Sequence, residues 1–106
     1  MTKKATRASR RRALTWSPRA VADLEAIGEY ISRDDPTKAE SWLSMLVSAA
    51  QQAALLPLSG RRVPEFGREE IREVIKKHYR IVYRITKTQI QVLTVFESHR
   101  QLKIEF

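Results

Sequence analysis

Residues 71–96 read IREVIKKHYRIVYRITKTQIQVLTVF, and this stretch decides the fold of the chain. It holds three segments rich in β-branched and aromatic residues, separated by short polar turns. We predict three β-strands, at Ile71–Ile75, Tyr79–Ile85 and Ile90–Phe96, with a hairpin turn at residues 86–89. The third segment is apolar on both faces, which is typical of a central strand with a neighbour on each side.

Alternation in the middle segment assigns its side chains to two faces of the sheet. The odd-numbered residues, two tyrosines and two isoleucines, lie on one face, which we expect to be buried. Arg80, Val82 and Arg84 lie on the other face, which we expect to be open and cationic. Glu73 and Glu97 are possible cross-strand partners for the two arginines, and an ordinary solvated sheet face is the alternative interpretation.

The region before the sheet predicts two helices. Ser17 can cap a helix whose first residue is Pro18, and apolar residues then recur at helical spacing. Asp35 and Pro36 repeat this arrangement for a second helix that runs to about Leu56. Two helices joined by so short a connection form an antiparallel hairpin.

The order of the elements indicates the fold class. A short apolar segment at Ala13–Trp16 is a plausible edge strand, so the order is β-α-α-β-β-β. We therefore predict an α+β fold with two layers, in which the helical hairpin packs on a small, mainly antiparallel sheet. A chain of 106 residues is long enough for one domain with a real core.

Composition excludes several classes of protein. The chain has no cysteine, which rules out disulfides and cysteine nucleophiles and fits a reducing compartment. It has neither an apolar run long enough to span a membrane nor the apolar core of a signal peptide, so we expect it to be cytoplasmic. With two histidines and no nucleotide-binding fingerprint, we expect no metal site and no cofactor.

Most of the net charge of +8 lies at the N-terminus. Residues 1–13 contain six basic side chains and no acidic one, whereas residues 14–106 contain 14 basic and 12 acidic side chains. We expect residues 1–12 to be a disordered basic leader and residues 13–106 to form the domain. The leader either binds an anionic partner or only adds solubility.

Ten polar residues are candidates for a functional surface. They follow the ends of the predicted strands and the loop before them, where they could converge on one concave cationic surface suited to phosphates or to an acidic protein. They are Arg61, Arg62, Glu65, Lys76, Lys77, Arg80, Tyr83, Arg84, His99 and Arg100.

The landmarks together resemble the ParE/RelE superfamily of toxins from type II toxin–antitoxin modules, often labelled plasmid stabilisation proteins. The resemblance runs from about Leu14 to Leu102 and depends on the order and spacing of its motifs. These are Trp16-Ser17-Pro18-Arg19-Ala20 with Asp23-Leu24 and Ile27, Asp35-Pro36, Leu56-Pro57, Gly60-Arg61, Val63-Pro64-Glu65, Arg72-Glu73, Tyr79-Arg80-Ile81-Val82-Tyr83-Arg84, Val95 and His99-Arg100.

The resemblance implies a cognate antitoxin that wraps and neutralises the toxin. The second predicted helix has more apolar side chains than one buried stripe needs. The additional ones are Trp42, Leu43 and Val47, and we expect them to bind an antitoxin segment. That segment would add an amphipathic helix or an extra strand. The implied partners are therefore the antitoxin and the cellular target.

Two targets stay open within the superfamily. ParE-like members inhibit DNA gyrase, and the long helical hairpin favours this interpretation. RelE-like members cleave mRNA on the ribosome, and some of them use a glutamate, an arginine and a histidine. Glu65, Arg80 and His99 fall at similar places and would then act as general base, phosphate ligand and general acid. Arg100 stands where those members have an aromatic residue. Under either interpretation, Arg61, Arg62, Lys76, Lys77, Tyr83, Arg84 and Arg100 would contact the target.

Overall fold

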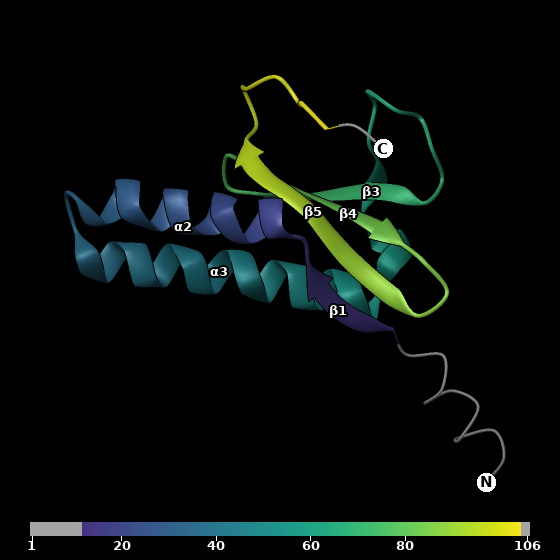
Figure 1. Ribbon diagram of the computed structural model, residues 1–106, viewed down its shortest axis with the longest axis horizontal. Helices are drawn as coiled ribbons and strands as arrows, with labels where there is room; N and C mark the ends of the chain where they lie inside the picture. Colours follow the sequence, from purple (N-terminus) through teal and green to yellow (C-terminus); the bar gives the residue numbers. More distant parts are fainter. Residues whose placement is uncertain (1–11, 105–106) are drawn as a thin grey trace, which may run out of the picture.

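The computed structural model describes residues 12–104, and Figure 1 shows a helical hairpin packed on one face of a sheet. The elements are β1 (Ala13–Trp16), α2 (Pro18–Ser32), α3 (Pro36–Leu55), the 3-10 turn η1 (Pro57–Ser59), β2 (Arg61–Arg62), β3 (Ile71–Lys76), β4 (Tyr79–Ile85) and β5 (Gln89–Glu97). The sheet order is β1-β5-β4-β3-β2, with β1 parallel to β5 and the other pairs antiparallel. The predicted α+β class, and the central place of β5, are confirmed.

One predicted segment lies mostly outside the described residues, and one predicted loop differs in the structure. The basic leader predicted for residues 1–12 lies outside the described residues, except for Arg12, whose Nε donates to the Thr86 carbonyl at 2.5 Å. The two-residue strand β2 lies in a segment predicted to be a loop, and it pairs with β3 at Arg72 and Glu73. Among the described residues, no helix is long and apolar enough to cross a membrane.

Both helices begin at the predicted caps. The Ser17 hydroxyl accepts from the Ala20 N–H at 3.0 Å, and an Asp35 carboxylate oxygen accepts from the Thr37 and Lys38 N–H groups at 3.1 and 3.2 Å. These bonds satisfy N–H groups that a helix leaves without intrahelical partners. The entry angles of both helices are therefore set by local side chains.

The main core lies between the helices and the sheet. Small residues on the helices allow close approach, and the odd-numbered side chains of β4 fill the space, as alternation predicted. The buried residues of this layer are Ala20, Leu46, Ala50, Ala53, Tyr79, Ile81, Tyr83, Ile90, Val92 and Val95. The helices themselves meet at Gly28, where an added Cβ would lie 2.8 Å from Leu43 Cδ1.

The second face of the sheet is also covered, so the prediction of an open cationic face is wrong. Val63, Ile71 and Val82 are completely buried there. Phe66 from the loop after β2 and Leu102 from the C-terminal segment pack against them. The even-numbered side chains of β4 thus enter a second, smaller core, because two irregular segments without alternation fold back over the sheet.

A β-bulge in β5 connects the sheet to α2. Val82 pairs with Thr94 and Tyr83 with Val92, which leaves Leu93 as an extra residue. Ser17 Oγ donates to the Leu93 carbonyl at 2.9 Å, beside the point where the pairing of β1 with β5 ends. The first turns of α2 therefore continue the hydrogen bonding that β1 begins.

Asp23 completes this connection one turn further along α2. Its Oδ2 accepts from the Val95 N–H at 3.0 Å and from the Thr94 hydroxyl. Thr94 and Val95 are both buried. Without Asp23, the Val95 N–H would lose its partner in a buried place, which costs stability.

We predict that Asp23→Ala lowers the free energy of unfolding by about 2 kcal/mol, the cost of leaving buried donors unsatisfied. Glu25→Ala, at an exposed position on the same helix, is the matched control and should change the stability by less than about 0.5 kcal/mol. Urea unfolding monitored by tryptophan fluorescence measures both. Equal, small effects of the two substitutions would contradict the proposed role of Asp23.

Candidate functional site

Arg80 lies at the centre of a buried ion-pair cluster on the second face of the sheet. Its two terminal nitrogens donate to the two carboxylate oxygens of Glu65, both at 2.8 Å. Its Nε donates to Glu73 Oε1 at 2.6 Å, and the other Glu73 oxygen accepts from Arg61 Nε at 2.7 Å. We call Arg61, Glu65, Glu73 and Arg80 the β-face cluster.

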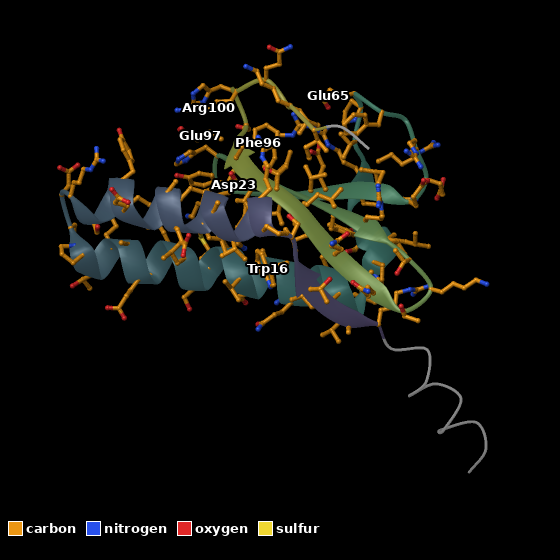
Figure 2. The ribbon with its side chains drawn as sticks, in the orientation of Figure 1. Trp16, Asp23, Glu65, Phe96, Glu97 and Arg100 are labelled. Carbon is orange, nitrogen blue, oxygen red and sulfur yellow. The ribbon has the colours of Figure 1, made fainter. Side chains whose placement is uncertain are left out.

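Three elements build the β-face cluster. Register places Arg61 opposite Glu73 on β2 and β3, and Ile75, two residues beyond Glu73, is opposite Arg80 on β4. Glu65 reaches Arg80 from the loop after β2, and Figure 2 shows it above the sheet on the far side of Phe96 from Arg100. The Phe96 ring lies 5.0 Å from the Arg80 guanidinium carbon, close enough for a cation–π contact.

Burial and pairing fix the charges of this cluster. The Glu73 side chain is 0% exposed and that of Arg80 is 8% exposed. Each charge is therefore stabilised by the other instead of by water. Hydrogen bonds from Arg80 lower the pKa of Glu65 to about 2, against a smaller opposing effect of desolvation. The same bonds to Glu65 raise the pKa of Arg80.

The β-face cluster carries no net charge, because its two arginines face two glutamates. All four side chains are engaged with each other, so Arg80 is not the open cation that alternation predicted. A carboxylate with a pKa of about 2 is also a weak base near neutral pH. The arrangement is thus suited to holding β2, β3, β4 and the loop at Glu65 together.

The predicted general acid His99 lies in a different place. It is exposed and, with Arg100, lines a groove between α2 and the C-terminal segment that neither Glu65 nor Arg80 lines. Figure 2 shows Arg100 and Glu97 above α2, at the end of β5. The ten candidates therefore do not converge on one surface, and the structure divides them among several.

Tyr83 is the clearest correction among the predicted target contacts. It is 1% exposed, and its hydroxyl donates to the Pro57 carbonyl at 2.6 Å. An added Cβ at Gly60 would lie 2.3 Å from that hydroxyl, so the close approach requires glycine there. Burial also raises the pKa of Tyr83. This tyrosine ties η1 to the sheet and cannot present a surface.

The remaining predicted contacts are distributed over β2, β3, the turn after β3 and β4. Arg62 on β2 pairs with Glu69 at 3.7 Å, and both side chains are largely exposed. Lys76 ends β3, and Lys77 forms the turn to β4 with a left-handed φ of 58°. Arg84 is half-buried on β4, opposite Gln91.

The three residues predicted to bind the antitoxin are half-buried on α3. Trp42 packs on the rings of His78 and Tyr79, with centroids 5.2 and 5.9 Å away. Leu43 packs on α2 at Gly28. Intramolecular packing thus accounts for the apolar surfaces of Trp42 and Leu43.

Exposed apolar side chains occur elsewhere, at the end of α3, in η1 and on β3. Four of the large apolar side chains exposed in residues 12–104 belong to this end of the molecule, namely Leu55, Leu56, Leu58 and Ile75. A shallow pocket of about 330 Å³ separates α3 from β3 beside Ile75. Because β2 covers only Arg72 and Glu73, the outer edge of β3 from residue 74 to 76 has no paired strand among the described residues.

Comparison with known proteins decides the family. The family described as the ParE toxin of the type II toxin–antitoxin system parDE matches residues 14–102. The chain belongs to the ParE toxin family. A protein of Sinorhizobium fredii (strain NBRC 101917 / NGR234) named "Putative toxin Y4kP" is 35% identical over 94 residues, which cover 86% of this chain and 93% of the relative.

Solved structures agree with this ParE family fold. A chain of the chromosomal ParDE system from P. aeruginosa has a TM-score of 0.71 and 23% identity, covering 84% of this chain and 98% of its own. A chain of the toxin–antitoxin complex RelBE2 from Mycobacterium tuberculosis has a TM-score of 0.58 and 22% identity, covering 81% and 96%. Like other family members, this ParE-type chain is the toxin of a type II module, with a cognate antitoxin as its partner.

Sequence reasoning missed two surfaces of this ParE family member. The run Leu55-Leu56-Pro57-Leu58 predicts the end of a helix, but it also contains three leucines, and all three side chains are exposed. A second signal is a stripe along α2 at spacings of three and four, made by Arg19, Asp23, Ala26, Tyr30 and Arg33. All five line the groove that contains His99.

We predict that Arg80→Ala lowers the free energy of unfolding by about 3 kcal/mol, because it leaves the carboxylate of Glu73 buried beside only one arginine. Removal of an arginine from an open, solvated sheet face would instead cost little stability. Arg62→Ala, which breaks an exposed pair, is the control and should cost less than about 1 kcal/mol. Denaturant unfolding of both variants tests the prediction. A cost for Arg80→Ala as small as that for Arg62→Ala would show that the β-face cluster contributes little.

Proposed function

We propose that this toxin acts on DNA gyrase, in the cytoplasm, and that its cognate antitoxin neutralises it. The observation that supports this over RNA cleavage is the state of the β-face cluster. Arg80, which would hold the scissile phosphate, already holds two carboxylates, and Glu65 has too low a pKa to accept a proton readily. The family match and the ParDE neighbour favour the same interpretation.

An RNA-cleaving toxin is the second candidate, supported by the direct contact between Glu65 and Arg80. Such an enzyme would need the pair to open on the substrate, so that Arg80 exchanges a carboxylate for a phosphate. His99 would also have to approach from a groove that the pair does not line. Both requirements call for a rearrangement of the segments that cover the sheet.

The two candidates differ in what stops first when the toxin is produced without antitoxin. A gyrase inhibitor should give double-strand DNA breaks and an SOS response before translation declines. An RNA-cleaving toxin should give mRNA cuts positioned by codon within minutes. Primer extension and pulsed-field electrophoresis on the same culture measure both. Early mRNA cleavage without DNA breaks would overturn the gyrase proposal.

We predict that His99→Gln stays toxic, because gyrase inhibition requires no proton transfer and the side chain is at most one polar contact among several in its groove. If His99 were a general acid, its loss would reduce activity by roughly a hundredfold or more. Colony counts after induction measure the effect, with circular dichroism to check the fold. His99 is exposed, so the substitution should leave stability unchanged. A large loss of toxicity in a folded variant would favour the RNA-cleaving candidate.

The antitoxin should bind at the seam between α3 and β3. The unpaired edge of β3 offers backbone groups to an added strand. Leu55, Leu56 and Leu58 offer exposed apolar side chains at the end of α3 and in η1, and Ile75 offers one on the face of β3 that points away from α3. Exposed apolar patches beside a free sheet edge are costly in a protein that stays alone in solution. An antitoxin segment would cover both features at once, which relocates the interface from the predicted Trp42, Leu43 and Val47.

We predict that Ile75→Glu weakens antitoxin binding by about tenfold or more, because it places a charge in an apolar interface. Val21→Glu changes a similarly exposed apolar residue on α2 and should change the affinity little. Co-expression with the product of the neighbouring open reading frame, followed by calorimetry on the purified complex, measures both. Equal binding by both variants would place the antitoxin elsewhere.

A further inference from the structure

A groove runs between α2 and the C-terminal segment. Its volume is about 870 Å³, and we call it the α2 groove. Figure 1 shows the C-terminal segment passing above α2 where it leaves the end of β5. Its lining includes the apolar side chains of Ile27 and Leu102 beside polar and charged ones. Neither the β-face cluster nor the α3–β3 seam contributes a residue to it.

Cations form the rim of the α2 groove. Arg19 and Arg33 line it from α2, and Arg100 and Lys103 line it from the C-terminal segment. Arg33 and Arg100 are 69% and 68% exposed and pair only loosely, at 3.6 Å to Glu29 and 3.5 Å to Glu97. Within residues 12–104, Arg19 and Lys103 form no ion pair.

The cations of the α2 groove are therefore available to a partner, unlike Arg80 of the β-face cluster, which is 8% exposed. Asp23 also lines the groove, but its carboxylate is engaged by Val95 and Thr94. Arg19 and Arg33 are 14 positions apart, which corresponds to about 21 Å along a helix. This length matches a peptide segment of several turns or a shorter extended strand.

We infer that the α2 groove binds an acidic, amphipathic segment of the protein on which the toxin acts. The inference rests on the proposed function, because it assigns the target-binding surface of that toxin. Four cations that line a groove together with apolar side chains complement a segment with an apolar stripe and flanking carboxylates. A nucleic acid fits less well, because its phosphates would contact only the cations and would leave Ile27 and Leu102 without an apolar partner.

Separate surfaces then serve the two partners. The antitoxin covers the α3–β3 seam, which is apolar and has a free strand edge, while the target segment occupies the cationic α2 groove. Steering by exposed cations also speeds the encounter with an acidic target and makes it sensitive to salt. Neutralisation would then require the bound antitoxin to extend to the groove or to block the target sterically.

The test is a charge reversal with a matched control. Arg33→Glu combined with Lys103→Glu reverses both sides of the rim, and Lys38→Glu combined with Lys87→Glu makes the same change of charge at exposed positions outside the groove. We expect the groove variant to lose toxicity by about tenfold or more, as for lost charge complementarity at an interface. We expect the control to keep wild-type toxicity, and both to keep the wild-type melting temperature and antitoxin binding.

A second arm measures binding directly and does not depend on toxicity. The probes are a fluorescein-labelled 20-residue helical peptide rich in leucine and glutamate, and a single-stranded RNA of the same net charge. Wild-type chain should bind the peptide more tightly than the RNA, and the groove variant should lose the peptide. Equal binding of the peptide by both variants, or a preference for RNA, would overturn the inference.

The outcomes separate this inference from the proposed function. Full toxicity of the groove variant beside a toxic wild type would overturn the inference alone. Loss of antitoxin binding in the groove variant would assign the groove to the antitoxin and also overturn it. Absence of toxicity in the wild type would overturn the proposed function, and the peptide arm would still decide what the groove binds.

Discussion

The buried carboxylate of Glu73 is the constraint on which much of the sheet depends. A carboxylate without exposure is tolerated only where cations and hydrogen bonds replace water, and Arg61 and Arg80 supply them from the two neighbouring strands. Glu65 then neutralises the second arginine and fixes the loop after β2. One buried charge thus determines the position of three strands and a loop.

Because of this constraint, the charges that stabilise the fold are different from those that a partner can contact. Cations that satisfy buried carboxylates are not available to a partner, however suggestive their spacing in the sequence. Exposed and loosely paired cations lie instead along α2 and the C-terminal segment, on the other side of Phe96. Charge alone therefore does not identify a binding surface, because burial and pairing decide which charges a partner meets.

Much of the fold follows from local rules that a sequence displays. Ser17-Pro18 and Asp35-Pro36 are helix starts by simple capping chemistry, and both begin helices here. Alternation over residues 79–85 correctly separated the two faces of β4. The two-sided apolar pattern of residues 90–96 likewise predicted a central strand, which β5 is.

The contacts between distant segments could not be predicted from the sequence, because no periodic pattern of residues indicates them. Leu102 and Phe66 lie in segments without alternation, so nothing local shows that they cover the second face of the sheet. The partners of Arg80 come from residues 7 and 15 positions away, and only the register of β3 and the path of a loop bring them together. Glu73 was considered as a cross-strand partner, but its complete burial depends on that covering layer.

The pairing of β1 with β5 has a consequence for the order in which the chain folds. Ser17 and Leu93 are 76 positions apart, and the bonds between them exist only when the last strand has been synthesised. Contacts of such separation form late, because the loop that they close costs much entropy. During translation, therefore, the hairpin of α2 and α3 leaves the ribosome without the strand that it must cover.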